Sequence, residues 1–329
     1  MNCKPLVTIS MLTYNQEKYV RDAVRGLLAQ TYEPLEIVIS DDCSTDKTWE
    51  IIQDEVSTYK ANGGCHQRIV LNRNPKNLGL AKHSAYCSRF RHGVLGVGAA
   101  GDDISLPCRV EKIVEAWENS GRKATLITHN VIEIDIDGRQ LGARCDVSSE
   151  KPFGAAFTYA VKVGSEFAPL KVAGYYEDVV YSFRALMVGD EVNIDEPLML
   201  YRVGSGMSTV KRNWRMPNLK TVRADVCSAR QNLIDLAQFK DRLSIERYTM
   251  LYKRARKRLH EGVYLSHLYG GSTFRERFAA FRVVRYKPFF RPGAVMQLLC
   301  LLPHQIGDPL LNTIWAARQM LAHIFQAKG

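Results

Sequence analysis

The first hundred residues alternate between short apolar runs without a helical period and longer segments that have one. Four runs rich in β-branched and apolar residues are typical of buried parallel strands. They span residues 6–12, 35–40, 68–72 and 94–99. Helical periodicity fills the intervals, for example over residues 19–28, where apolar residues recur on one face. This alternation predicts βαβ units, and hence an α/β fold with a mostly parallel, Rossmann-like sheet flanked by helices.

The chain divides into two parts of different charge. Residues 1–204 contain 23 basic and 27 acidic residues, whereas residues 205–329 contain 22 basic and 7 acidic residues. The spacing predicts helices over residues 107–119 and 178–188, strands over 125–135 and 197–203, and a helical, basic region from 213 onward. Apolar residues make up 46% of the chain, enough for a sizeable core. We therefore expect one domain over residues 1–205 and a second, helical and basic, over residues 206–329.

Cysteine usage and the lack of long apolar segments favour a cytoplasmic location. The eight cysteines are scattered without a C-x-x-C pair, so they are expected to be reduced. The N-terminal sequence lacks the charged head and apolar run of a signal peptide. The longest apolar run, residues 294–303, is about half of the roughly 20 residues that a membrane-spanning helix needs.

Polar side chains follow three of the expected strands. They are Thr13, Tyr14 and Asn15, then Asp41 and Asp42, and finally Asp102 and Asp103. Ligands of open α/β sheets bind beyond the carboxyl ends of the strands, so four carboxylates are expected at one edge, where a hard cation could share them. Each residue alone is more commonly a helix cap or a turn residue, and Asn15 stands where a cap would. No G-x-G-x-x-G motif follows the first expected strand and no phosphate loop is present, which argues against a dinucleotide-binding oxidoreductase.

The order of motifs resembles that of a known enzyme family. The segment VTISMLTYN is followed by QTY, LEIVISDD and STD, then by NLGL at residues 77–80 and GDDISLP at 101–107. An E-D pair at 177–178 and a Y-R pair at 201–202 come later. This combination, over roughly residues 5–209, resembles the family-two, GT-A-fold inverting glycosyltransferases that build bacterial surface polysaccharides such as lipopolysaccharide. The resemblance does not cover the last 120 or so residues.

The resemblance implies a role for each matching residue. Thr13, Tyr14 and Asn15 would line the nucleotide pocket, with Asp41 bonded to the base and Asp42 beside it in the donor site. Asn77 and Gly79 would lie near the ribose and diphosphate, and Asp102 would contact the ribose or sugar. Tyr201 and Arg202 would complete the donor site. Asp103 would bind the Mg²⁺ or Mn²⁺ that bridges the diphosphate. Asp178 would be the general base, with Glu177 beside it. One base and one Lewis acid suffice for inversion, and no motif supplies the nucleophilic carboxylate of a retaining enzyme.

Two departures from the family pattern and two other readings accompany this interpretation. Ala100 stands where many relatives carry an extra Asp, and Gly204 where a His is common, a role that Ser205, Ser208, Lys211 or Arg212 could take over. A catalytically silent scaffold that binds sugar nucleotides or membranes is therefore an alternative. A nucleotidyltransferase is a weaker one, because the glycine-rich triphosphate loop is absent.

Three smaller features have both a structural and a functional interpretation. The E-D pair can stabilise the dipole of the helix that it precedes. His129 can approach an acceptor or serve as a buried structural histidine. Trp214 can belong to a lid over the donor or pack against the C-terminal region.

Basic and aromatic residues are interleaved in the C-terminal region. Five basic residues fall within 253–258, and six more alternate with aromatic residues over 274–291. This pattern favours peripheral contact with an anionic membrane on its cytoplasmic face, strengthened by an amphipathic segment at 310–325. Nucleic acid is a rival partner without a recognised motif, and a solvated helical face is the structural alternative. Membrane contact suits a glycan acceptor that is lipid-linked.

Overall fold

The computed structural model describes residues 4–64, 66, 68–144, 147–149, 154–168, 170, 174–205 and 219–270, with side chains of residue 264 and residues 267–270 left aside. The chain forms two compact units. Unit 1 contains Met1–Leu170, Tyr176–Thr209 and Asp241–Leu243, and unit 2 contains Lys171–Tyr175, Val210–Lys240 and Ser244–Gly329. The expected segment 310–325 and Trp214 lie outside the described residues.

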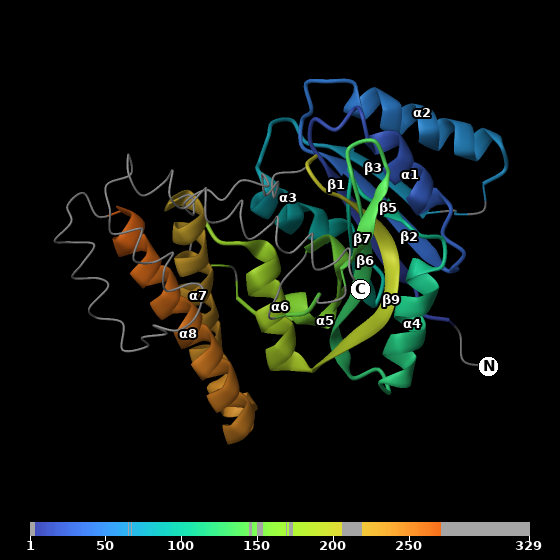
Figure 1. The fold of residues 1–329 in the computed structure, drawn as a ribbon. Helices are drawn as coiled ribbons and strands as arrows, with labels where there is room; N and C mark the ends of the chain where they lie inside the picture. Colours follow the sequence, from blue (N-terminus) through green and yellow to red (C-terminus); the bar gives the residue numbers. More distant parts are fainter. Residues whose placement is uncertain are drawn as a thin grey trace, which may run out of the picture. The chain divides into compact units, whose positions relative to one another are not determined.

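The N-terminal half of the sheet in unit 1 is parallel, as the strand–helix alternation predicts. Its strands run in the order β3-β2-β1-β4, and the first three are labelled in Figure 1. They are β1 (Val7–Thr13), β2 (Leu35–Asp41), β3 (Arg68–Arg73) and β4 (Leu95–Ala100). The connections contain α1 (Val20–Leu28), α2 (Thr48–Ala61), α3 (Leu80–Cys87) and the 3-10 turn η1 (Ser88–Phe90). Because the strands are parallel, β1, β2 and β4 all end at the same edge of the sheet.

The second half makes the whole sheet mixed. From β4 the order continues through β8, β6, β9 and β5, with β7 paired to β6. These strands are β5 (Ile104–Ser105), β6 (Ala124–Ile134), β7 (Gln140–Arg144), β8 (Phe157–Ala160) and β9 (Asp190–Arg202). β6 and β9 are parallel, whereas β8 is antiparallel to both β4 and β6. The α/β class is confirmed, and the half that contains β1 to β4 is parallel throughout.

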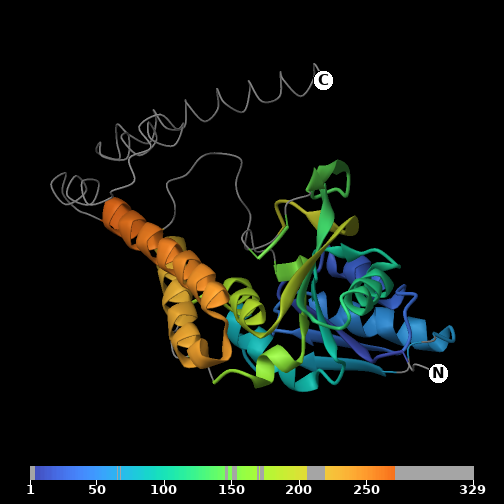
Figure 2. The ribbon, with the colours of Figure 1, turned by 90° about the horizontal axis from the view of Figure 1, so that it is seen from below.

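Four short or medium helical elements complete unit 1. They are α4 (Arg109–Asn119), η2 (Gly154–Ala156), α5 (Lys162–Ser165) and α6 (Glu177–Val188). α4 and α6 lie on opposite sides of the β6–β9 pair (Figures 1 and 2). The buried core between the sheet and its helices is aliphatic, with Ile9, Ile37 and Leu126 all fully buried. Burying such side chains stabilises the fold by about 1.5–3 kcal/mol each.

The strand expected over residues 197–203 is longer in the structure and includes Pro197. β9 begins at Asp190, and its register against β6 shifts between His129 and Asn130, where Asn130 pairs with Pro197. A proline cannot donate a ladder hydrogen bond, so it is tolerated at such a bulge. The polar residues around this bulge interrupt the alternation of apolar residues, so the sequence pattern does not predict this part of the strand.

Unit 2 is described over two helices, α7 (Leu219–Phe239) and α8 (Ile245–Gly270), with the 3-10 turn η3 (Lys240–Arg242) between them. The two helices pack along their apolar faces, where Leu236 and Leu251 are fully buried. An ion pair of 3.0 Å between Arg258 and Asp225 joins them as well. Over the described residues, neither these helices nor those of unit 1 have the length and apolar character needed to span a bilayer.

Candidate active site

The end of β1 is bonded to the end of β2. The Thr13 hydroxyl donates to Asp41 Oδ1 over 3.2 Å, and both residues are buried. Asn15 adopts a left-handed backbone conformation with φ of 51°, and its side-chain oxygen accepts the amide of Thr45 over 2.9 Å. It therefore does not cap α1, which begins five residues later, and the capping prediction is wrong. Tyr14 between them is 45% exposed, an unusual state for a large aromatic residue beside a buried strand.

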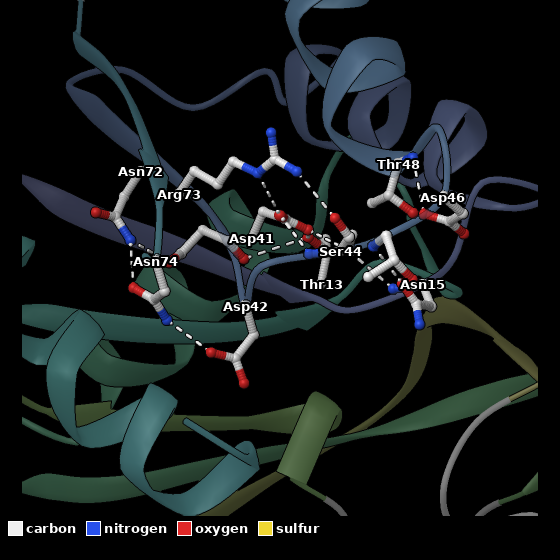
Figure 3. A network of polar contacts seen from close by, with 12 residues as sticks. Thr13, Asn15, Asp41, Asp42, Ser44, Asp46, Thr48, Asn72, Arg73 and Asn74 are labelled. Carbon is white, nitrogen blue, oxygen red and sulfur yellow. Dashed lines mark hydrogen bonds and ion pairs between the residues drawn. The ribbon is translucent and has the colours of Figure 1, made fainter. Parts of the chain in front are cut away.

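The Asp41 carboxylate is surrounded by protein donors. Its Oδ2 accepts the Ser44 amide over 2.9 Å, and its Oδ1 also accepts the Ser44 hydroxyl (Figure 3). Arg73 Nε lies 3.5 Å from Oδ2. These contacts compensate the charge of a side chain that is fully buried. In this structure the carboxylate holds the loop after β2 in place.

Asp42 is likewise satisfied by the protein. Its oxygens accept the amides of Leu78 and Gly79, each over 2.9 Å, and the side-chain amide of Asn74 over 2.8 Å. The Asn74 contact is visible in Figure 3. Gly79 has φ of +76°, which favours glycine at this position before α3. Asp42 therefore fixes the loop that carries Asn77 and Gly79, and Asn77 itself is exposed.

The turn formed by residues 101–103, here called the aspartate turn, follows β4 and approaches β1. A Cβ at Gly101 would lie 2.6 Å from Thr13 Cγ2, so only glycine allows this approach. Asp102 and Asp103 are buried, with 6% and 5% exposed surface. Burial, followed by the charge of Asp102, raises the pKa of Asp103 well above its usual range. A bound cation would offset both effects, because it favours the ionised carboxylate.

Arg202, expected in the donor site, organises the aspartate turn from β9. Its amide donates to Asp103 Oδ1 over 2.9 Å, and its Nε donates to the Asp102 carbonyl over 3.1 Å. The rest of the guanidinium bonds to the carbonyls of Asp135 and Ile136 and stacks over the Tyr19 ring at 4.7 Å. The preceding Tyr201 is partly buried on β9. Arg202 of the Y-R pair thus contacts the site by hydrogen bonds to Asp102 and Asp103, one of them from its backbone amide.

Ser205 also contacts the aspartate turn. Its hydroxyl donates to Asp102 Oδ2 over 2.8 Å. It directly follows Gly204, which has φ of +102° and stands where relatives often have a His. Of the four residues considered as substitutes for that His, Ser205 contacts the acidic residues, and Ser208, Lys211 and Arg212 lie outside the described part of the chain.

Glu177 and Asp178, here called the acidic pair, form the first turn of α6. Burial, followed by the charge of Asp178, raises the pKa of Glu177 to about 7. The Val179 amide donates to Asp178 Oδ1 over 2.8 Å, which is a helix-terminal contact. Tyr159 on β8 is affected by the same charges, and burial raises its pKa well above the usual range. The acidic pair therefore combines a helix-terminal position with a perturbed environment, which is typical of functional carboxylates.

The four strand-end aspartates do not share one cation. Asp41 and Asp42 are engaged by protein donors, and within the described ranges no three acidic, histidine or cysteine side chains converge as cation ligands. The four aspartates follow strands in the same way, but their surroundings differ. Asp102 and Asp103 form the acidic centre that a cation could join.

Two residues that the motifs did not single out prove to be structurally important. Gln30, within the QTY motif, is buried and bonds to the Leu106 carbonyl over 2.8 Å and to the Val110 amide over 3.1 Å. Arg109, at the start of α4, is fully buried. His129 is buried beside it and satisfied on both ring nitrogens, as expected from the structural interpretation of this histidine. The motifs gave no indication of these contacts.

The fold is that of the GT-A-type nucleotide-diphospho-sugar transferases. The structure of Staphylococcus aureus TarS residues 1–349 in complex with UDP-GlcNAc is similar with a TM-score of 0.57 and 14% identity, covering 91% of this chain and 82% of that one. The mannosyltransferase PcManGT of Pyrobaculum calidifontis, in complex with GDP-Man and Mn²⁺, gives a TM-score of 0.55 and 14% identity, covering 95% and 88%. At these identities the likeness concerns the fold.

Sequence comparison identifies the family. Residues 8–161 match the model of Glycosyl transferase family 2, so the chain carries a family 2 glycosyltransferase domain. A putative glycosyltransferase EpsE of Bacillus subtilis is 33% identical over 118 residues, which are 36% of this chain and 40% of that protein. The uncharacterized glycosyltransferase MJ1057 of Methanocaldococcus jannaschii is 31% identical over 140 residues, or 42% and 46%. The chain thus spans less than half the length of these relatives.

Proposed function

We propose that the protein transfers a sugar from a nucleoside-diphosphate donor to a hydroxyl of a glycan acceptor, with inversion at the anomeric carbon. The observation that carries the proposal is the presence, within unit 1, of both a buried aspartate turn in the family 2 region and an acidic pair at a helix start. The first group suits a diphosphate with its cation, and the second suits proton transfer. The TarS and PcManGT complexes, which hold UDP-GlcNAc and GDP-Man, support a nucleotide-sugar donor.

The donor site in this proposal lies at the ends of β1, β2 and β4. The exposed ring of Tyr14 offers a surface for the nucleotide base beside Thr13, Asn15 and Asp41. The loop containing Asn77 and Gly79 is held by Asp42 and would lie along the ribose and diphosphate. Ser205 and Arg202 orient Asp102 for contact with the ribose or sugar.

Asp103 would hold a divalent cation, Mg²⁺ or Mn²⁺, and the donor set fits one. The residue offers a hard carboxylate, and burial raises its pKa in a way that a cation would reverse. Asp102 adds a second carboxylate, and Arg202 fixes the turn from behind. When bound, such an ion neutralises the charge of the diphosphate. The Mn²⁺ in PcManGT supports this assignment.

Asp178 would be the general base that accepts the proton of the acceptor hydroxyl. The Val179 amide donates to its Oδ1 and so fixes the orientation of this carboxylate, which lies in the first turn of α6. Glu177, with a pKa of about 7, is partly protonated at neutral pH. When it is protonated, Glu177 adds no second charge beside Asp178, the carboxylate proposed to take the proton.

The test of this proposal is nucleoside diphosphate release from a panel of UDP-, GDP- and dTDP-sugars, with Mn²⁺ or with EDTA. We expect release from one donor, dependent on the metal and stimulated by a membrane extract that supplies an acceptor. Tight donor binding without release, even with the extract, would instead favour the catalytically silent scaffold.

We further propose that the acceptor is lipid-linked, for synthesis of a surface polysaccharide, and that the protein contacts the cytoplasmic face of an anionic membrane. The support is the basic face of α8, where Lys253, Arg256 and Lys257 are exposed. Each basic residue near such a surface contributes about 1 kcal/mol. Co-sedimentation with phosphatidylglycerol vesicles should be lost in a variant with all three changed to Gln. Equal binding to phosphatidylcholine vesicles would contradict an electrostatic contact.

A further inference from the structure

Arg109 is the largest of the fully buried side chains in the described structure. All of its assigned hydrogen bonds go to neutral groups, and they use all three nitrogens of the guanidinium. Nε donates to His129 Nε2 over 3.0 Å, and one terminal nitrogen donates to Ser105 Oγ over 2.9 Å. Burial lowers the pKa of Arg109 to about 10, so it stays charged at neutral pH. The Asp103 charge offsets part of this burial without a hydrogen bond, and the neutral partners of Arg109 show what else the guanidinium holds.

The other terminal nitrogen of Arg109 joins two backbone segments. It donates to the Gly98 carbonyl over 2.8 Å and to the Ala155 carbonyl over 2.6 Å. Gly98 belongs to β4, three residues before the aspartate turn begins, and Ala155 belongs to η2. The two segments also touch directly, since a Cβ at Gly98 would lie 2.9 Å from the Gly154 carbonyl oxygen.

η2 in turn lies against the acidic pair. A Cβ at Gly154 would be 3.4 Å from Asp178 Cβ and 3.9 Å from Glu177 Oε1. The backbone beside Ala155 therefore supports the side chains of the acidic pair. One guanidinium thus bonds both to the strand that leads into the aspartate turn and to the segment against which the acidic pair packs.

The base of Arg109 is itself held rigidly. It begins α4, whose first turn is fixed by Gln30 through the Val110 amide and the Leu106 carbonyl. His129 is kept neutral because burial and then the Arg109 charge lower its pKa to about 3. Its Nδ1 contacts the Asn130 carbonyl over 2.8 Å, so this nitrogen carries the proton and Nε2 is free to accept from Arg109. The guanidinium is therefore fixed at all of its edges.

We propose that Arg109 is a positioning residue for sugar transfer, setting the distance between the aspartate turn and the acidic pair. This inference rests on the proposed function, because it assigns the diphosphate cation to one group and proton transfer to the other. The planar fork of arginine reaches four acceptors at once, which a lysine ammonium on a flexible stem does not. The hydrogen bonds of Arg109 go neither to Asp103 nor to the acidic pair, so it positions them through β4 and η2, while its charge also favours the ionised form of Asp103.

The test compares Arg109→Met and Arg109→Lys with the wild type in two measurements. The first is steady-state nucleoside diphosphate release with the donor and extract that the wild type uses. We expect kcat per folded molecule to fall about 100-fold in both variants, the order of loss that a misplacement of about 1 Å causes. The donor KM should change less than kcat, because the contacts proposed for the base at Tyr14, Asn15 and Asp41 are untouched.

The second measurement is hydrogen exchange, which does not depend on activity. Peptides covering residues 99–104 and 154–160 should exchange at least about tenfold faster in Arg109→Met, while a peptide covering β2 is unchanged. Uniform acceleration along unit 1, or none, would overturn the proposal. Should Arg109→Met fail to fold, Arg109→Lys keeps the charge and gives the same comparison.

A burial-matched control separates positioning from stability. Arg184 on α6 is 4% exposed, and its guanidinium packs over Phe167. Arg184→Met should lower the melting temperature but leave kcat per folded molecule within about threefold of the wild type. If Arg109→Met behaves in the same way, the positioning role is wrong. A wild type that releases no nucleoside diphosphate would refute the proposed function, whereas the exchange data would still decide whether Arg109 ties the two segments together.

Discussion

The end of β2 and the aspartate turn after β4 both carry two adjacent buried aspartates, yet the two pairs differ in how far protein donors compensate their charge. Asp41 and Asp42 accept backbone amides, hydroxyls and an asparagine amide, and an arginine lies beside Asp41. Asp103 accepts one backbone amide, and its pKa is raised well above the usual range by burial and by Asp102. The same dipeptide thus makes a stabilising anchor in one place and an electrostatically strained centre in the other.

This difference indicates how to tell structural from functional carboxylates. A buried carboxylate that the protein satisfies contributes to the stability of its loop. One that the protein leaves undercompensated costs stability, and such a cost is expected where a ligand restores the balance. The acidic pair belongs with Asp103 in this respect, because the pKa of Glu177 is raised to about 7. The following predictions test this division.

The largest effect is expected for Asp178→Asn, which removes the proposed base but keeps its shape. Loss of general-base catalysis should lower kcat about 1,000-fold, while donor affinity is retained. Isothermal titration with the donor and Mn²⁺, alongside nucleoside diphosphate release, measures both quantities. Asp137→Asn, in the exposed turn after β6, is the matched control and should leave turnover unchanged. Turnover by Asp178→Asn close to the wild-type rate would remove Asp178 from the mechanism.

Asp42→Ala should be the most destabilising change among the strand-end aspartates. It leaves the amides of Leu78 and Gly79 and the Asn74 side chain without their acceptor, at a cost of about 3 kcal/mol in the free energy of unfolding. Urea unfolding followed by circular dichroism measures this loss. The control Asp54→Ala removes a carboxylate that is 66% exposed, and it should change stability by less than about 0.5 kcal/mol. Equal stabilities of the two variants would show that Asp42 is not an anchor.

Asp103→Asn should have the opposite sign and stabilise the metal-free protein by about 1 kcal/mol at pH 7.5. Because its pKa is raised in the folded state, the contribution of Asp103 to stability is full below the usual value of 3.8 and is lost as pH rises toward the folded-state pKa. Thermal unfolding with EDTA measures the gain. Asp41→Asn, which removes an acceptor from a satisfied carboxylate, should lower the melting temperature. If Asp103→Asn were less stable than the wild type, the proposed difference between the aspartates after β2 and those of the aspartate turn would be wrong.

The sequence was sufficient to predict the parallel half of the sheet. Residues 6–12 and 35–40 are rich in apolar and β-branched residues without a helical period, as in buried parallel strands, and β1 and β2 lie within a residue of the expected positions. The bulged β9 was underestimated because its apolar residues do not alternate regularly around Pro197. Antiparallel β8 has four residues, too few for periodicity to reveal.

The sequence predicted which candidate residues lie near one another, but not which of their side chains the protein itself satisfies. Residue type and strand order were enough to bring Thr13 and Asp41 together, as their hydrogen bond shows. The division between satisfied and undercompensated aspartates depends on which amides reach them, and these come from residues up to 99 positions away along the chain. Arg109 lies shortly after the GDDISLP motif, yet its partners lie on four other elements that no local pattern connects.

The smallest effect is expected for Glu177→Gln, and it concerns pH dependence. In the folded state the pKa of Glu177 is raised from 4.5 to about 7, so the folded protein binds a proton that the unfolded chain releases between these values. The wild type should therefore lose stability relative to Glu177→Gln as pH rises from 4.5 to 7, with no further relative change above pH 8. Melting temperatures of the two proteins at pH 5 and pH 8 should differ by a few degrees more at pH 8, in favour of Glu177→Gln. Parallel pH profiles would mean that Glu177 is ionised throughout, and the acidic pair would then belong with Asp41 and Asp42 among the satisfied carboxylates.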